Sequence, residues 1–225
     1  MAPRLRALSN ASRLWLAAGN VNPPIANQFV YEGRGVFDVP LWRKAVEAVA
    51  AANPGVRLTL KGHLTFSRWI DSGLSTPLAV IEAPEWDGRG SDKAPFLQGG
   101  FPIRGGSMAE VLLIQGDPAR VIFRSHHAVM DGRGTFTWAE DVFRALRGED
   151  IRTSDVGIIE DDLLNISPGS AGKPMSQRFA APRLRPPGAE RGIIWRRLSF
   201  QGRFARLLPQ VMLLAAEEIR RTATG

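Results

Sequence analysis

Two adjacent histidines and an Asp-Gly pair are the residues of this chain whose types and spacing could do chemistry. His126 and His127 are two of only three histidines, and Asp131-Gly132 begins four residues after the second. A neutral imidazole can take up a proton near pH 7 and give it back, so this side chain suits general acid–base catalysis. Residues 126–132 are therefore a candidate catalytic stretch.

The elements on either side must hold this stretch in place. An alternating, apolar-rich run at residues 119–123 predicts a strand that delivers the histidines, paired as a hairpin with a strand at 109–115. Since side chains alternate along a strand, His126 and His127 are expected on opposite faces, one for packing and one towards a cleft. Asp131-Gly132 predicts a turn, and helical spacing of apolar residues at 135–146 predicts a helix after it.

The upstream part of the chain alternates between strand and helix patterns. Asp38 is a candidate N-cap for a helix at 39–52, with Pro40 in its first turn and Asn53-Pro54-Gly55 as its stop. Residues 1–19 predict a short helix or an ordered lead-in, which two prolines end. Strands are expected at residues 27–36, 56–60 and 78–81, with another short run through Trp69-Ile70.

The pattern His-His-x-x-x-Asp-Gly is the signature of the CoA-dependent acyltransferase superfamily, which the chain resembles over roughly residues 12–150. This superfamily includes chloramphenicol acetyltransferase, condensation domains of nonribosomal peptide synthetases, wax-ester and diacylglycerol acyltransferases, and polyketide-associated acyltransferases. The order of the expected elements is similar to the N-terminal half of the condensation type. The resemblance implies an α/β fold, a chloramphenicol acetyltransferase-like sandwich in which helices cover a mixed or antiparallel sheet.

The resemblance also assigns roles to the motif residues. It makes His127 the catalytic residue and His126 a structural one that faces the core, and it has Asp131 pair with an arginine to fix the turn. Arg57 is the candidate partner, since it stands where the family's RHExLR stretch has its last arginine, with Arg34 and Arg124 as alternatives. Gly132 is expected where the backbone passes close to the histidine or has a positive φ.

The activity implied by the resemblance is transfer of an acyl group from a thioester to an amine or hydroxyl. CoA or phosphopantetheine would then be part of the substrate, with no bound cofactor and no metal, and an acyl carrier protein or acyl-CoA would be the partner. The Asp-Phe-Gly motif of the condensation-domain C-terminal half is not found in this sequence, so a second polypeptide or another copy is expected to complete the site. The alternative is a non-catalytic module that binds a carrier protein or an acyl ligand.

Composition narrows the function classes. The chain of 225 residues has no cysteine, which excludes disulfides, thiolate catalysis and cysteine-ligated metal sites. No apolar run approaches the length of a membrane span, and the protein is expected to be cytoplasmic. Aromatic residues are not interleaved with the basic ones in the way that nucleic-acid binding favours. Glu160-Asp161-Asp162 lacks metal-ligand spacing and is interpreted as a solvated acidic turn.

The positive charge is concentrated at the C-terminal end, which suggests where the domain boundaries lie. Of 29 basic and 22 acidic residues, 11 and 3 come after residue 169, so the excess of +7 belongs to this last quarter. Such a basic surface could attract an acidic carrier protein, the phosphates of CoA or another polyanion. We expect the motif-bearing domain at residues 1–150, a loop-rich linker at 151–192, and a crossover strand with an amphipathic helix at 193–225.

Overall fold

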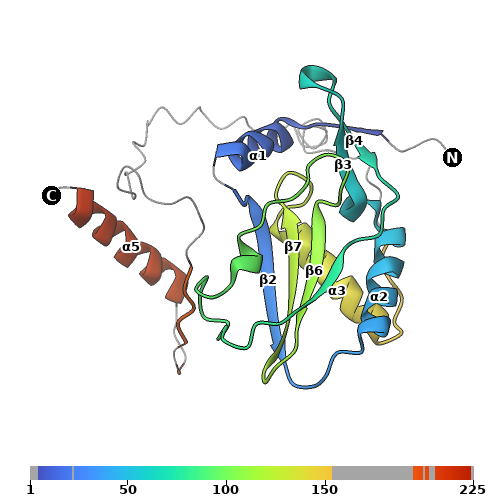
Figure 1. Ribbon diagram of the computed structural model, residues 1–225. Coiled ribbons are helices and arrows are strands. Elements are labelled where there is room, and N and C mark those ends of the chain that lie inside the picture. The colour runs from blue at the N-terminus through green and yellow to red at the C-terminus, as the bar shows by residue number, and fades with distance from the viewer. Residues whose placement is uncertain (1–4, 22, 154–194, 200, 203–205, 224–225) are drawn as a thin grey trace.

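The computed structural model describes residues 5–21, 23–153, 195–199, 201–202 and 206–223. Its centre is a four-stranded sheet in the order β2-β7-β6-β5, formed by β2 (Ala26–Gly33), β7 (Ala119–His126), β6 (Ala109–Ile114) and β5 (Leu78–Ile81) (Figure 1). β7 is antiparallel to both of its neighbours, whereas β5 runs parallel to β6. All eight residues of β7 are buried, so the strand that leads to the histidines is held rigidly on both sides.

Two helices, α2 (Val39–Ala52) and α3 (Gly132–Leu146), pack on one face of this sheet. The predicted cap of α2 is confirmed, since the Asp38 carboxylate accepts a hydrogen bond from Leu41 N at 3.0 Å and Pro40 lies in the first turn. The helix ends at the expected residue because Asn53 and Pro54 follow it. The core between the helices and the sheet includes Trp42, Val46, Val49, Val111, Phe123, Trp138 and Val142.

The other face of the sheet is covered by the irregular segment at residues 82–103, which contains the short 3-10 helix η3 (Pro95–Leu97). Trp86, Leu97, Leu112 and Ile122 form its core, and Trp195 packs against them. Among the described residues, the α-helices that pack on this sheet therefore lie on one face, as the predicted mixed α/β sandwich requires. The expected α/β class, with a mixed sheet, is confirmed.

A second, three-stranded sheet lies beside the histidine end of β7. Its order is β1 (Leu5–Ala7), β4 (Arg68–Asp71) and β3 (Leu58–Lys61), all antiparallel. The helix α1 (Asn10–Val21) crosses above it, and the two share a core of Leu8, Leu58, Leu60, Trp69, Met108, Ala128 and Val129. Because Ala128 and Val129 belong to the candidate stretch, this small sheet supports the turn that follows the histidines.

One predicted strand begins later than expected. Residues 54–57 form the 3-10 helix η1 (Pro54–Arg57), and β3 starts only at Leu58; another single turn, η2 (Leu64–Phe66), joins β3 to β4. Pro54 has no N–H for a ladder and its ring fixes φ, so the chain makes one more turn before it extends. This shift moves Arg57 out of the strand in which the sequence placed it.

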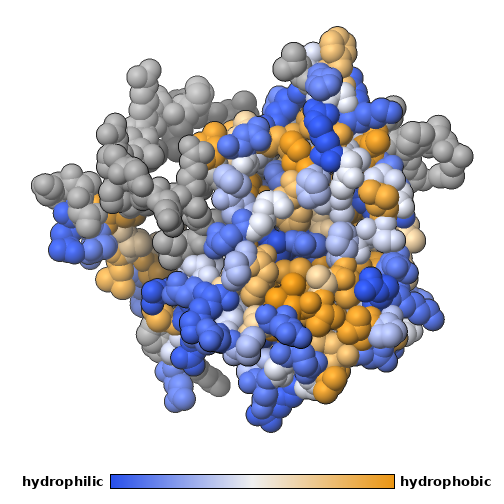
Figure 2. Space-filling model, viewed as in Figure 1, coloured by the Kyte–Doolittle hydropathy of each residue, from blue (hydrophilic) through white to orange (hydrophobic). Residues whose placement is uncertain are grey.

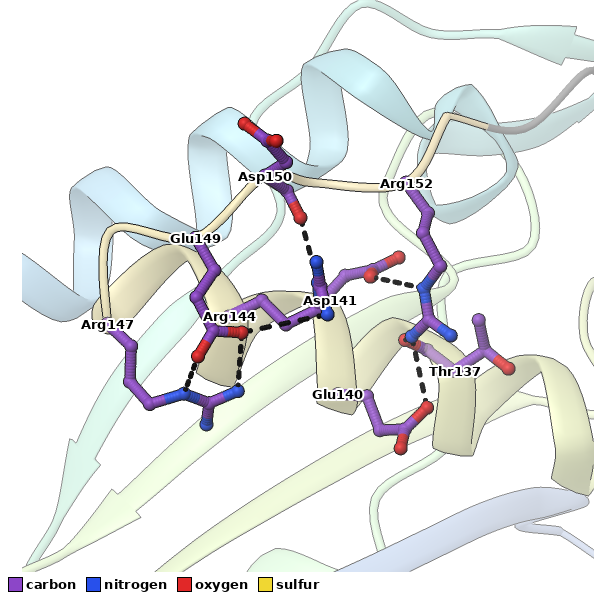
Figure 3. Close-up of polar contacts among 8 residues, drawn as sticks. All are labelled: Thr137, Glu140, Asp141, Arg144, Arg147, Glu149, Asp150 and Arg152. Carbon is purple, nitrogen blue, oxygen red and sulfur yellow. Dashed lines mark hydrogen bonds and ion pairs between the residues drawn. The ribbon is translucent and has the colours of Figure 1, made fainter.

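The residues that follow α3 are bound to this helix by a cluster of hydrogen bonds and ion pairs (Figure 3). Arg152 Nε donates to the buried Asp141 carboxylate at 2.7 Å, and a second Arg152 nitrogen lies 3.0 Å from Glu140. Arg147 Nε forms an ion pair with the Glu149 carboxylate at 2.5 Å, and Arg144 Nε donates a hydrogen bond to the backbone carbonyl of Asp150 at 2.8 Å. These contacts fold residues 147–152 back along α3, so the packed domain extends slightly past the boundary expected at residue 150.

After residue 153, the structure describes residues 195–199, 201–202 and 206–223. Most of the predicted linker at 151–192, with its acidic turn Glu160-Asp161-Asp162, lies outside the described residues. In the predicted strand at 193–200, the described residues form one antiparallel bridge, Gly90 to Arg196, and an ion pair between Arg197 and Glu32.

The predicted C-terminal helix is present as α5 (Leu207–Ala223). It stands away from the sheet, and its Leu208, Met212 and Leu214 side chains are exposed (Figures 1 and 2). Within the described ranges, no helix is both long and apolar enough to cross a membrane.

Candidate active site

The two histidines lie where β7 ends. His126 is the last residue of the strand, and its N–H donates to Met108 O at 2.8 Å, whereas His127 N donates to Ile25 O at 3.0 Å. The backbone then turns, because Val129 N donates back to His126 O at 3.1 Å. His127 therefore belongs to a turn, and the strand alternation used to place the two rings on opposite faces does not apply. Both rings instead contact α1, one turn of that helix apart.

The His126 ring is buried and held by the backbone. Its side chain is 5% exposed, and Nδ1 accepts a hydrogen bond from Ala128 N at 3.0 Å. The edge of Phe101 approaches the ring, with centroids 6.2 Å apart. Burial, and secondarily the neighbouring His127, lowers the pKa of His126 from its ordinary 6.5 to about 4. At neutral pH this histidine is uncharged.

The His127 ring is half-buried and stacks on Trp15. The centroids are 4.0 Å apart and the planes differ by 17°. Nδ1 is buried without a hydrogen-bond partner among the described residues, so the stack, and not a hydrogen bond, orients the ring.

Hydrogen bonds of two serines connect helix α1 to the turn that follows His126. Ser9 caps the helix by accepting from Ser12 N at 3.0 Å, and the Ser12 hydroxyl donates to Ala128 O at 3.0 Å. Trp69 Nε1 adds a longer contact of 3.4 Å to the same hydroxyl. Trp15 and Ser12 did not emerge from the sequence as site residues. A Ser cap before an apolar helix is a local signal that could have located the start of α1, but nothing local indicates which part of the chain this helix contacts.

Asp131 is the N-cap of α3. Its carboxylate accepts from Gly134 N at 2.7 Å, and its backbone carbonyl accepts from Thr135 N at 3.0 Å and from Thr135 Oγ1 at 2.9 Å. Its side chain is exposed, so it does not need an arginine to offset the cost of burial. The carboxylate fixes the turn through the helix cap.

The arginine partners proposed for Asp131 bind elsewhere. Arg57 forms an ion pair of 2.5 Å with Asp71, so the predicted Arg57–Asp131 pair is wrong. Arg124, the second candidate, pairs with Glu110 and donates to the carbonyls of Leu97 and Gly99. Burial lowers the pKa of Arg124, although the Glu110 charge acts in the opposite direction. Arg34, the third candidate, lies exposed at the far end of β2.

The role expected for Gly132 is also wrong. It is the first residue of α3, it is not among the glycines with positive φ, and a Cβ placed there would meet no atom within 4 Å. The close approach occurs at Gly19 of α1, where a Cβ would stand 3.1 Å from His126 Nε2. The glycine that lies next to the histidine pair is therefore 107 residues upstream of His126 in the sequence.

Within the described residues, no three His, Cys, Asp or Glu side chains come together in a way that could hold a metal ion. The polar groups around the turn include the two imidazoles, the serines of α1, the Asn27 amide and the capping carboxylate. Such an arrangement can hold a neutral imidazole next to a reacting group and move a proton.

Comparison with known proteins gives matches at the level of structure. No family model and no curated protein sequence matches the chain. Among solved structures, the X-domain from teicoplanin biosynthesis has a TM-score of 0.57 at 17% identity, covering 72% of this chain and 37% of that one. The epimerization domain from the third module of tyrocidine synthetase B has a TM-score of 0.56 at 16% identity, with 73% and 40% covered.

A third match is the starter condensation domain of rhizomide synthetase, in complex with C8-CoA. Its TM-score is 0.56 at 20% identity, covering 73% of this chain and 42% of that one. The chain thus spans less than half of the length of the solved structures that it matches. Over that span it has the condensation-domain fold, of the chloramphenicol acetyltransferase-like type, as the resemblance implied.

Proposed function

We propose that the chain supplies the histidine-bearing part of a condensation-type acyltransferase, which moves an acyl group from a carrier-protein or CoA thioester to an amine or hydroxyl. The observation that carries this proposal is the position of the His-His-x-x-x-Asp-Gly motif. It lies at the end of the buried strand β7 in a condensation-domain fold, with the His127 ring oriented by Trp15 and the turn fixed by the Asp131 cap.

In this proposal His127 handles the acceptor proton. The acceptor nitrogen or oxygen attacks the thioester carbonyl carbon while the imidazole removes its proton. The new C–N or C–O bond forms, the C–S bond breaks, and the imidazolium returns the proton to the leaving thiolate. CoA or phosphopantetheine leaves as the thiol, so it is a substrate in this reaction and not a bound cofactor.

A second surface is needed opposite the histidines, and we propose that another polypeptide, or another copy of this chain, provides it. The solved structures with this fold are more than twice as long as the matched part. In addition, 11 of the 29 basic residues come after residue 169, which would favour docking of an acidic carrier protein.

Release of thiol from acyl-CoA in the presence of an amine acceptor tests the activity. Because the chain has no cysteine, it adds no thiol of its own to the signal of a thiol-reactive dye, and a reaction without acyl-CoA corrects for the thiols of any companion polypeptide. The assay is run with the chain purified from its source together with any bound polypeptide. We expect His127→Ala to lower the rate about a hundredfold or more while the circular dichroism spectrum is retained. An unchanged rate would exclude His127 as the catalytic residue.

The non-catalytic alternative makes a different prediction. A binding module would bind acylated carrier protein without consuming the thioester, whatever companion chain is added. Size-exclusion chromatography with light scattering identifies the companions, and the thiol assay repeated with each of them distinguishes the two functions.

A further inference from the structure

A small pocket of about 170 Å³ lies beside the histidine pair, between α1, the segment before β2 and the loop at residue 101. Its lining includes the apolar side chains of Leu16, Ile25, Phe101 and Ile103, and one edge of His126. None of the described residues that line it is an Asp, Glu, Lys or Arg. A charged ligand would therefore be desolvated there without a compensating charge, so the pocket selects an uncharged ligand.

Two polar side chains line this pocket, the Asn20 amide and the His126 imidazole, and the orientation of the imidazole is fixed by the backbone. His126 Nδ1 accepts the Ala128 N–H and so carries no proton, which leaves the proton of the neutral ring on Nε2. Nε2 points towards α1, since a Cβ on Gly19 would be 3.1 Å from it. The described contacts include no hydrogen bond at Nε2. The pocket thus offers the His126 Nε2–H as a fixed donor, next to the Asn20 amide and the apolar side chains.

These properties define the class of ligand. A cavity of about 150 Å³ is large enough for benzene, so this pocket has room for about six non-hydrogen atoms. A short acyl group fits this description, because it has a small apolar chain and one carbonyl oxygen that can accept the hydrogen bond. We propose that the pocket binds a short, uncharged acyl group whose carbonyl oxygen accepts a hydrogen bond from His126 Nε2. The proposal rests on the acyltransferase function and adds the size of the acyl group.

The proposal gives His126 a binding role beyond structural support, and it gives Gly19 a reason to lack a side chain. The Gly19 backbone does not have a positive φ, so the helix itself does not require glycine there. Alanine is the better helix former, and the absence of a Cβ keeps the Nε2 edge of His126 accessible.

The experiment is a binding titration of the full chain, labelled with ¹⁵N-histidine, with the butanoyl thioester of N-acetylcysteamine. Long-range ¹H–¹⁵N spectra at pH 7 should show the Nε2–H form of His126 and a shift of its Nε2 resonance on binding. Gly19→Ala should weaken binding about tenfold or more by obstructing the pocket. His126→Asn should do the same, because the Asn amide can accept the Ala128 N–H but does not reach the position of Nε2.

Gly33→Ala is the matched control, since a Cβ there meets nothing within 4 Å and Gly33 lies outside this pocket. It should bind the thioester as the unmodified chain does. Equal affinities of Gly19→Ala and Gly33→Ala would overturn the proposal, as would a His126 ring protonated on Nδ1. Thiol release by the unmodified chain with an amine acceptor separates the two proposals. If this chain binds the thioester in a Gly19-dependent way but releases no thiol, the subsite stands and the acyltransferase function fails. If it releases thiol but its binding does not depend on Gly19, the function stands and the subsite fails.

Discussion

Trp15 of α1 and His127 of the motif turn form a parallel stack, with ring centroids 4.0 Å apart. The residues are 112 positions apart in sequence, and the stack exists because α1 is anchored over the end of β7. It restricts the rotation of a ring whose Nδ1 finds no hydrogen-bond partner in the described structure. In the proposed acyltransferase, Trp15 is therefore a positioning residue.

Replacement of Trp15 tests this role. An aromatic pair contributes about 0.5–1.5 kcal/mol beyond burial, so Trp15→Leu should lower kcat of thiol release by up to about tenfold, whereas Trp15→Phe should retain most of it. KM should change little, because the stack acts on the histidine and not on the acyl group. If kcat falls in the two variants only to the extent that their melting temperatures fall, Trp15 has a structural role and does not position His127.

The Ser12 hydroxyl should contribute to stability more than an exposed serine does. It donates to Ala128 O at 3.0 Å and is buried, so Ser12→Ala leaves that carbonyl without its partner. We expect a loss of about 1–3 kcal/mol in the free energy of unfolding by urea. The exposed Ser75→Ala is the control and should change it by less than about 0.5 kcal/mol. Equal effects of the two substitutions would mean that α1 is not fastened through Ser12.

A double-mutant cycle separates the ion pair in the structure from the one expected from the sequence. Arg57 lies 2.5 Å from Asp71, and both side chains are 20% exposed. Alanine substitutions at these two positions should show a coupling energy of about 0.5–3 kcal/mol in urea denaturation. Arg57 and Asp131 should show almost none. A larger coupling with Asp131 than with Asp71 would restore the pairing that the family resemblance implied.

The depressed pKa of His126 predicts a pH-dependent stability. The folded value is about 4 and the ordinary value is 6.5, so between these two pH values the unfolded chain binds more protons. Stability should therefore be complete above about pH 6.5 and fall as the pH is lowered towards 4, by at most about 3 kcal/mol. Urea titrations from pH 4 to 7 measure this slope. His126→Asn should have a smaller slope, and an identical slope would assign the effect to other groups.

The sequence determined those elements whose signals are local. Alternation predicted the β6–β7 hairpin, and the bounds of α2 followed from the Asp38 cap and from Asn53-Pro54. The His-His-x-x-x-Asp-Gly spacing also identified the candidate site, and the fold that this motif implied is the one found. These features depend on neighbours within a few residues, where propensity and capping act.

The tertiary structure alone decided which distant residues meet. It brings Trp15 onto His127, pairs Arg57 with Asp71 and places Gly19, not Gly132, next to the His126 ring. Each of these outcomes depends on how α1, β3 and β4 pack around the end of β7. A charged group or an aromatic ring can pair with many partners at similar energy. Packing between residues that are far apart in the sequence therefore selects the partner, and no local sequence pattern predicts it.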